Sequence, residues 1–416
     1  MKLKLSGCYT HGQRPVSGAT LLQAARALAA IVAARPAPII NDCERRDEFM
    51  VALLAGALCE QPNLLPPNTT THALDQLAQD YPGARRASVM MAGMPAASAA
   101  TNTTQLEVPA QATAVVAFSS GSTGKPKATS KSWLSLVGVA QRLVSVLELE
   151  GRGAAICATV PAQHSYGLET TVLTALAADC CIHSGKPFYP GDVAQALDQL
   201  QAPRLLVSTP LHLRVILNSG VSLPPLAGVV SATAPLEADL ARALEQAWAC
   251  PVQEIYGSTE TGALASRMTT QSANWTLFPG IRFGDPARPE LDSDHLPAGL
   301  QLEDTVRMHS STSFELLGRP QNMLKVGGKR YSTDALQAQL LQLAGVSDAA
   351  VWVPDGAARP AALVVCSGTT PAQIRSQLAA RVDAVFLPRP LKQVEQIPRG
   401  ATGKASAAEL QRLLRS

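Results

Sequence analysis

The sequence has few aromatic residues, little charge and no pattern typical of a metal site. Aromatic residues make up 4% of the 416 residues, and charged residues make up 16%. The eight cysteines include no C-x-x-C pair and the seven histidines form no cluster, so a structural zinc site is not expected. Most cysteines stand among apolar residues, which favours free thiols in a reducing, cytoplasmic compartment over disulfides.

Long apolar runs are also missing. Lys2 and Lys4 stand near the start, but polar residues interrupt the sequence that follows, so a secretory signal is not expected. Residues 19–34 are rich in alanine and leucine, yet Gln23 and Arg26 make this stretch too polar to span a bilayer. It predicts an amphipathic helix.

Positive charge is concentrated at the C-terminal end. The formal net charge is +3, but residues 319–416 contain 13 Lys and Arg against 6 Asp and Glu, a balance of +7 that leaves −4 for residues 1–318. The basic residues are scattered among few aromatic ones, which disfavours nucleic acid as a partner. A small molecule bearing phosphate, or an acidic protein, fits this end better.

Apolar strands and helical patterns alternate over the first 255 residues. Helices are expected near 20–34, 44–59 and 131–147. The expected strands are 37–40, 114–118, 155–160, 204–208, 227–231 and 251–255. This order predicts an α/β fold, in which layered, mostly parallel sheets are flanked by helices.

The remaining segments have a different character. Residues 92–113 are small, polar and without a period, so they predict a surface connection. Residues 263–318 predict short strands with turns. The last hundred residues predict a compact α+β unit that ends in a basic loop and a short helix.

Residues 115–127, VVAFSSGSTGKPK, join a buried strand to a loop that is suited to phosphate. Its glycines let the backbone approach a charged oxygen, its hydroxyl side chains and N–H groups can donate hydrogen bonds, and Lys125 and Lys127 add positive charge. The candidates for phosphate binding are Ser119, Ser120, Gly121, Ser122, Thr123, Gly124 and Lys125. A solvated linker is the alternative. The P-loop of NTPases does not fit, because Ser119 and Pro126 replace residues which that motif requires.

Three further loops follow apolar strands, at the strand ends where open α/β sheets bind ligands. They are residues 161–167 (PAQHSYG), 231–236 (SATAPL) and 256–262 (YGSTETG). Each is weak evidence alone, since a single His or Tyr in a loop is more often a packing residue.

The four loops in this order resemble the adenylate-forming superfamily of acyl- and aryl-CoA synthetases, nonribosomal adenylation domains and luciferases. The resemblance continues at Asp304, at Gly318-Arg319, at residues 325–330 (KVGGKR) and at residues 398–404 (PRGATGK). It implies a large adenylation domain over residues 1–318, a hinge over 319–322 and a small mobile C-terminal α+β domain over 323–416.

The resemblance also implies an activity that uses ATP. Such enzymes join a carboxylic acid to ATP with release of pyrophosphate, and a thiol then takes the acyl group from the acyl-adenylate. By this resemblance, Ser119, Ser122, Thr123 and Lys125 would bind the β- and γ-phosphates, and Thr259 the α-phosphate. Glu260 would hold Mg²⁺, which commonly takes one carboxylate together with phosphates and water.

The remaining implied roles concern the nucleoside, the acid and catalysis. The adenine would lie between Tyr256, followed by Gly257 and Ser258, and the Ala234-Pro235 turn. Asp304 would bind the ribose, with Arg319 nearby. His164 would gate the carboxylate, and Tyr166 would line the acyl pocket. Lys404 would bridge the carboxylate and the α-phosphate; its alternative is a solvated terminal lysine.

The sequence departs from the family pattern in two ways. After Gly318-Arg319 most members carry a charged hinge residue, whereas this chain has Pro320 and Gln321, and Gln321 is the expected pivot. The chain is also short: 114 residues precede Val115, and Asp304 follows Glu260 by 44 positions. We therefore expect trimmed N-terminal and barrel-like subdomains around intact catalytic loops.

The short length is similar to that of ligases of aryl polyene and xanthomonadin-type pathways, which load an aromatic acid onto an acyl carrier protein. The basic C-terminal end suits an acidic carrier protein, and it suits the 3′-phosphate of coenzyme A equally well. Two further classes of protein stay open. One is an amino-acid adenylation module, in which an acidic side chain binds the ammonium group of the substrate; after His164 only Glu169 could take this role. The second is a nucleotide-binding protein that has lost catalysis.

Overall fold

The structure is a computed structural model that describes residues 1–5, 7–11, 14–94, 104–119, 127–285, 288–318, 323–326, 329–354, 357, 359–382, 384–399 and 405–415. The chain divides into two compact units, Met1–Arg282 with Asp292–Leu300, and Phe283–Leu291 with Gln301–Ser416. The α/β class is confirmed. The hinge expected at 319–322 lies outside the described residues, and the boundary expected after residue 318 stays a prediction.

The larger sheet of the first unit has a parallel centre. Its parallel strands, in spatial order, are β2 (Cys8–His11), β11 (Cys181–His183), β10 (Ala155–Ala158), β12 (Arg204–Ser208), β13 (Gly228–Ser231) and β14 (Val252–Ser258). Beyond β14 come the antiparallel strands β15 (Gly262–Arg267) and β16 (Trp275–Leu277), and beyond β2 comes β3 (Arg14–Ser17). The strands predicted at 155–160, 204–208, 227–231 and 251–255 are confirmed.

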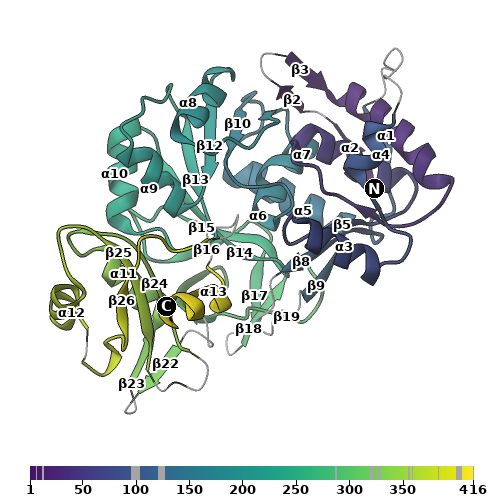
Figure 1. Ribbon diagram of the computed structural model, residues 1–416. Coiled ribbons are helices and arrows are strands. Elements are labelled where there is room, and N and C mark those ends of the chain that lie inside the picture. Colours follow the sequence, from purple (N-terminus) through teal and green to yellow (C-terminus); the bar gives the residue numbers. More distant parts are fainter. Residues whose placement is uncertain are drawn as a thin grey trace. The chain divides into compact units, whose positions relative to one another are not determined.

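Three amphipathic helices cover one face of this sheet (Figure 1). They are α8 (Pro190–Asp198), α9 (Pro210–Asn218) and α10 (Ala238–Trp248). Leu197, Leu213 and Leu244 from these helices pack in one core with Leu206 and Val229 of the strands beneath. Burying these side chains stabilises the sheet by about 1.5–3 kcal/mol per residue.

A second, smaller sheet carries the phosphate-loop strand. Its order is β6 (Arg85–Arg86), β4 (Ile39–Ile40), β5 (Asn63–Leu65), β8 (Thr113–Ser119) and β9 (Lys127–Ser132), and only β9 runs antiparallel to its neighbour. Helix α3 (Thr71–Asp80) packs Leu74 and Leu77 on this sheet. The predicted helices are confirmed as α1 (Gly18–Ala33), α2 (Arg46–Leu58) and α5 (Trp133–Val146).

The segment expected to be an irregular connection contains regular structure. Strand β7 (Gln105–Glu107) pairs antiparallel with β1 (Lys2–Lys4). Three residues are too few for a period to appear in the sequence, and the partner strand is about a hundred residues away. Among the described helices, none combines the length and the apolar character needed to cross a membrane.

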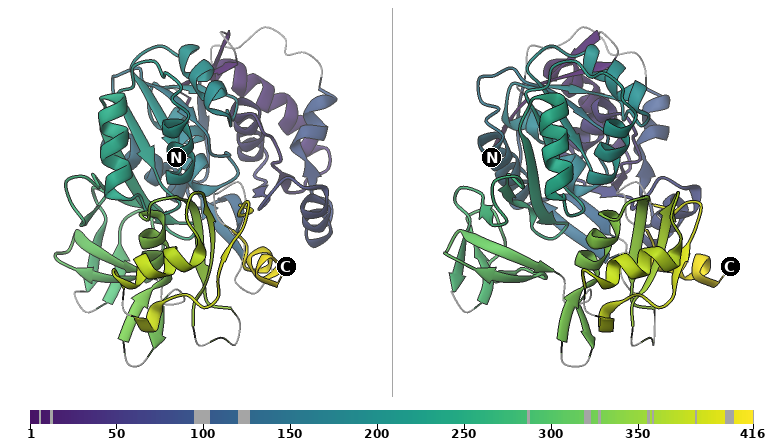
Figure 2. Two further views of the ribbon diagram at one scale, coloured as in Figure 1. Left: turned by 60° about the vertical axis from the view of Figure 1, so that its left-hand side comes forward. Right: turned by 90° about the vertical axis from the view of Figure 1, so that its left-hand side faces the viewer.

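The second unit is built around a three-stranded sheet with helices on both faces. Strand β25 (Ala361–Cys366) pairs with β24 (Val346–Trp352) and β26 (Leu391–Gln393). Helices α11 (Thr333–Leu341) and α12 (Pro371–Ala379) pack on one face, and α13 (Ala407–Arg415) packs Leu410 on the other, where Figure 2 shows it in yellow at the C-terminus.

Shorter strands complete this part of the chain. Two antiparallel hairpins are formed by β20 (Thr305–Met308) with β21 (Ser313–Gly318) and by β22 (Met323–Val326) with β23 (Lys329–Ser332). A small sheet contains β17 (Arg282–Asp285), β18 (Arg288–Asp292) and β19 (Leu300–Gln301). Strands β17 to β21 agree with the short strands predicted for residues 263–318, while β22 and β23 follow that range.

Candidate functional site

Three of the predicted loops lie at one edge of the larger sheet. Strand β10 precedes residues 161–167, β13 precedes the Ala234-Pro235 turn, and β14 runs into the turn over 256–262. These strands belong to one parallel set, so their C-terminal ends share an edge. Open α/β sheets bind ligands at this edge.

The phosphate loop is closed at its base by one pair of residues. Ser119 of β8 and Lys127 of β9 are Cα partners in an antiparallel ladder. The loop candidates that lie outside the described residues are Ser120, Gly121, Ser122, Thr123, Gly124 and Lys125. Of Ser119 only the backbone is described. Both ends of the loop are therefore fixed, and its phosphate contacts stay predictions.

Glu260 meets the residues that follow the phosphate loop. The Lys127 Nζ atom lies 2.8 Å from Glu260 Oε1, and the Lys131 Nζ atom donates to the Glu260 carbonyl oxygen at 2.9 Å. Partial burial raises the pKa of Glu260, but the hydrogen bond and charge of Lys127 outweigh this effect, so the pKa lies below its usual value. The Glu260 carboxylate is therefore charged near neutral pH.

The turn that carries Glu260 is tight. A Cβ atom on Gly257 would lie 2.2 Å from the Gly262 carbonyl oxygen, and Gly262 has a φ of +71°, so both positions require glycine. Within the turn the Ser258 N–H donates to Thr261 Oγ1 at 3.0 Å. Thr259 and Glu260 lie half-buried between these contacts. The backbone thus holds both predicted phosphate-site residues on one short turn.

Glu254 ties the predicted adenine turn to the strand that bears Tyr256. Its side chain is 2% exposed, Oε1 accepts from the Leu236 N–H at 2.8 Å, and Oε2 accepts from Arg267 Nε at 2.7 Å. Ala234 and Pro235, just before Leu236, are exposed. Glu254 is not among the residues predicted from the sequence. The sequence gives one indication of its role: a carboxylate stands within the apolar strand VQEI, and a charge buried in such a strand requires partners.

Tyr256 and Trp275 pack together beside this turn. Their ring centroids lie 5.4 Å apart, and the Arg267 guanidinium lies 4.4 Å from the centroid of the buried Trp275 ring. Tyr256 itself is half-buried. Its aromatic ring is therefore held on one side, as a stacking residue would need.

Residues 164–166 begin a short helical segment. His164 precedes α6 (Ser165–Gly167) and is half-buried. The Tyr166 hydroxyl donates to the carbonyl oxygens of Ser208 at 3.2 Å and Val230 at 2.9 Å, at the ends of β12 and β13. Burial raises the pKa of Tyr166 well above its usual value. Tyr166 fastens this loop to the sheet edge, and its place in an acyl pocket stays a prediction.

A buried arginine fixes the backbone under the same edge. Arg46 is 1% exposed and its guanidinium donates to the carbonyl oxygens of Ala158 and Val160, after β10, and of His183 and Gly185, after β11. Burial lowers the pKa of Arg46 to about 10, so it stays charged. No sequence pattern indicates this role, because the four acceptors are backbone atoms.

The remaining predicted residues belong to the second unit. Asp304 is half-buried between β19 and β20. Arg319, Gln321 and Lys404 lie outside the described residues. Whether these groups meet Glu260 stays a prediction.

The segment leading toward Lys404 is anchored within the second unit. Arg399 forms two hydrogen bonds with the Asp348 carboxylate, at 2.7 and 3.1 Å, and a third with the Ala349 carbonyl oxygen at 2.8 Å. Both partners belong to β24. The chain is thus fixed to the sheet up to residue 399.

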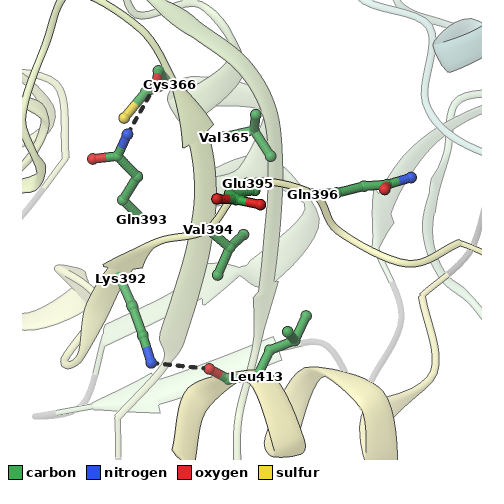
Figure 3. Close-up of a pocket in the computed structure, with 8 residues that line it drawn as sticks. All are labelled: Val365, Cys366, Lys392, Gln393, Val394, Glu395, Gln396 and Leu413. Atoms are coloured by element: carbon green, nitrogen blue, oxygen red, sulfur yellow. Dashed lines mark hydrogen bonds between the residues drawn. The ribbon is translucent and has the colours of Figure 1, made fainter. Parts of the chain in front are cut away.

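A pocket of about 870 Å³ lies in the second unit (Figure 3), and the described residues that line it include none of the predicted site residues. It is lined by Val365, Cys366, Lys392, Gln393, Val394, Glu395, Gln396 and Leu413. Gln393 Nε2 donates to the Cys366 carbonyl oxygen at 3.0 Å, and Lys392 Nζ donates to that of Leu413 at 3.1 Å. The Gln393 and Lys392 side chains thus donate to backbone carbonyl oxygens of the pocket's own lining residues.

The donor set at Glu260 fits a magnesium ion that is held mainly by phosphate. Among the described residues, no group of three or more His, Cys, Asp or Glu side chains could hold a metal ion. Mg²⁺ typically takes one or two carboxylates and completes its shell with phosphate and water oxygens. A single charged carboxylate next to a phosphate loop matches this requirement.

Comparison with known proteins identifies the family of this chain. The AMP-binding enzyme family matches residues 7–281. A 4-coumarate–CoA ligase from Rhodobacter capsulatus is 31% identical over 266 residues, which cover 64% of this chain and 66% of that protein's length.

Solved structures share the fold over nearly the whole chain. ATP-bound MatB from Rhodopseudomonas palustris has a TM-score of 0.79 at 21% identity and covers 100% of this chain and 96% of its own. A benzoate CoA ligase from Burkholderia xenovorans has a TM-score of 0.76 at 17% identity, with coverages of 98% and 97%. Since the family match spans more than half of the residues, the chain belongs to the AMP-binding enzymes of the adenylate-forming superfamily.

Proposed function

We propose that the protein is an ATP-dependent acid–thiol ligase that forms AMP. The observation that carries this proposal is the contact between Lys127 and Glu260, which joins the base of the phosphate loop to the expected Mg²⁺ carboxylate. Family membership supports the adenylating step. The Rhodobacter capsulatus relative, a CoA ligase by name, supports transfer to a thiol.

The proposed reaction has two steps. In the first, an oxygen of the acid carboxylate bonds to the α-phosphorus of ATP and the bond to pyrophosphate breaks. In the second, a thiol sulfur bonds to the acyl carbon, the thiol loses its proton, and AMP leaves. The first step brings the negative carboxylate to a negative phosphate, so fixed positive charge should lower its barrier.

Residues of the first unit would bind the nucleotide. The phosphates would contact the loop at Ser119, Ser122, Thr123 and Lys125, and the α-phosphate would contact Thr259. Bound Mg²⁺ would neutralise phosphate charge, with Glu260 as its protein ligand. The adenine would lie between the Tyr256 ring and the Ala234-Pro235 turn, a role that the hydrogen bond from Leu236 to Glu254 supports.

Residues of the second unit would complete the site. Asp304 would accept hydrogen bonds from the ribose, with Arg319 nearby, and Lys404 would supply charge between the carboxylate and the α-phosphate. We propose that residues 319–322 form the hinge and that Gln321 is its pivot. Gln321→Pro should then spare one half-reaction and block the other, and equal loss of both would argue against a hinge.

We propose that the acid is aromatic and lacks an amino group. In the segment that follows His164, residues 165–173, the one acidic side chain is Glu169, and this carboxylate is 2% exposed and already accepts hydrogen bonds from Ser165 and Ala263. The relatives named for coumarate and benzoate support an aromatic acid. His164 would gate the carboxylate, and Tyr166 would border the acyl group.

The acceptor in this proposal is a phosphopantetheine thiol, on an acyl carrier protein first and on coenzyme A as the alternative. The basic C-terminal end supports either acceptor, and both named ligases are CoA ligases. A cytoplasmic location also belongs to the proposal, since all eight cysteines are free thiols.

A pyrophosphate-release screen tests the function. Benzoates, cinnamates, fatty acids and amino acids would each be offered with ATP and Mg²⁺, and with either coenzyme A or a phosphopantetheinylated carrier protein. We expect release with aromatic acids and an acyl-thioester product. Release with amino acids alone would overturn the aromatic assignment, and no release with any acid would overturn the ligase assignment.

A further inference from the structure

A lysine is buried in a strand whose other residues are mostly open to solvent. Lys131 of β9 is 5% exposed, while Lys127, Ala128 and Ser130 of the same strand are exposed. A buried ammonium loses its hydration and must find partners inside the protein. Its Nζ atom donates to the Glu260 carbonyl oxygen at 2.9 Å.

A buried glutamate holds the other end of the same turn. Glu169 is 2% exposed, and its Oε2 atom accepts from the Ala263 N–H at 2.7 Å. Its Oε1 atom accepts from the Ser165 hydroxyl at 2.7 Å, next to His164. Glu169 lies in the π-helical turn Leu168–Val172, a geometry often found at functional sites.

These two side chains bind the same short piece of backbone at two points. Lys131 binds a carbonyl at residue 260, and Glu169 binds an amide three residues later. Gly262 leaves room for the Glu169 carboxylate. Any other residue at position 262 would place a Cβ atom 3.0 Å from Glu169 Oε1, which is too close.

We infer that Lys131 and Glu169 form a positioning pair that clamps the Glu260 turn at both ends and so sets the affinity of the site for Mg²⁺ and ATP. This inference rests on the proposed role of Glu260. Neither side chain would touch the substrate. Groups that orient a metal ligand typically change metal affinity or activity about 10–100-fold when they are removed.

Three variants separate positioning from simple stability. Lys131→Met and Glu169→Gln each remove one charge and leave the other buried charge without its partner. The double variant removes both charges, so it should regain much of the stability lost in the single variants. Arg86→Met is a matched control in the same unit. It removes the partner of the buried Asp42 carboxylate, whose Oδ2 atom lies 2.7 Å from Arg86 Nε.

The measurement is the binding of a fluorescent ATP analogue as a function of Mg²⁺ concentration, with thermal unfolding of each variant alongside. We expect Lys131→Met and the double variant to need about 10–100 times more Mg²⁺ for half-maximal binding. Arg86→Met should lower the unfolding temperature and leave the Mg²⁺ requirement unchanged. Recovery of the normal Mg²⁺ requirement in the double variant would show a structural role and overturn the clamp.

The binding assay also separates this inference from the proposed function. If the unaltered protein binds the analogue with Mg²⁺ but releases pyrophosphate with no acid, the ligase assignment fails while the clamp can still be measured. If it releases pyrophosphate and Lys131→Met binds the analogue as the unaltered protein does, the clamp alone fails.

Discussion

Lys127 and Glu260 stand 133 residues apart in the chain, and their side chains form an ion pair of 2.8 Å. Lys127 begins β9 of the smaller sheet, and Glu260 lies in the turn after β14 of the larger one. The two side chains are 55% and 24% exposed, so the pair adds little to stability. Its effect is to join the phosphate loop to the carboxylate turn.

Glu260→Gln should remove the metal ligand and preserve the shape of the side chain. We expect acid-dependent exchange of pyrophosphate into ATP to fall by about 10²-fold or more, because preorganised charge at phosphate is lost. The unfolding free energy should change by less than about 1 kcal/mol, as for other partly exposed pairs. Exchange at the normal rate would exclude Glu260 as the Mg²⁺ ligand.

Lys404→Ala should separate the two half-reactions. Removing this charge should slow acid-dependent pyrophosphate exchange by about 10²–10³-fold. Transfer of the acyl group from a supplied acyl-adenylate to a thiol should persist. The control is Arg412→Ala, which removes an exposed positive charge from α13 in the same unit. Equal loss of both half-reactions in Lys404→Ala would contradict the assigned role.

Glu254→Ala should weaken nucleotide binding more than it slows chemistry. It leaves the Leu236 N–H and the Arg267 guanidinium without their carboxylate, so the adenine turn loses its attachment to β14. We expect the KM for ATP to rise about tenfold, equivalent to about 1.4 kcal/mol, with a smaller change in the KM for the acid.

Glu245→Ala is the matched control for Glu254. Its Oε1 atom also accepts from a backbone N–H of β14, that of Val252 at 3.3 Å, but at the opposite end of the strand. This variant should leave the KM for ATP unchanged. An equal rise in both variants would mean that β14 as a whole, and not the turn, determines nucleotide binding.

Arg46→Met should destabilise the first unit. The variant leaves four carbonyl oxygens under the sheet edge without a charged donor, and we expect the unfolding free energy to fall by about 3 kcal/mol. Arg152→Met, in the same unit, removes a side chain that is 53% exposed and paired with the exposed Glu148, and it should cost less than about 1 kcal/mol. Equal effects in denaturant titrations would argue against this account.

The strand-end loops could be predicted from the sequence because both of their signals are local. Apolar runs such as those at 204–208 and 251–255 mark buried strands, and glycine with hydroxyl residues marks the turns after them. Parallel pairing then brings the loops of β10, β13 and β14 to one edge without further information. The role expected of each loop residue came from the family resemblance.

The supporting residues could not be predicted in the same way. Lys131, Glu169 and Glu254 have partners 129, 94 and 18 residues away, and most of these partners are backbone atoms that any residue type provides. For Glu254 the sequence does show a charge within an apolar segment, VQEI, whereas Lys131 lies in the polar segment KATSKS and gives no such signal. Such a charge indicates that a partner exists, and only the fold shows which one.

The attachment of Arg399 to β24 also limits the travel of Lys404. Lys404 comes five positions after Arg399, and an extended chain spans at most about 3.6 Å per position, so the chain allows the Lys404 backbone a distance of at most roughly 18 Å from that anchor. Deleting two residues of this tether would shorten its reach by about 7 Å. In the proposed mechanism, the length of the segment between 399 and 404 therefore matters as much as the lysine at its end.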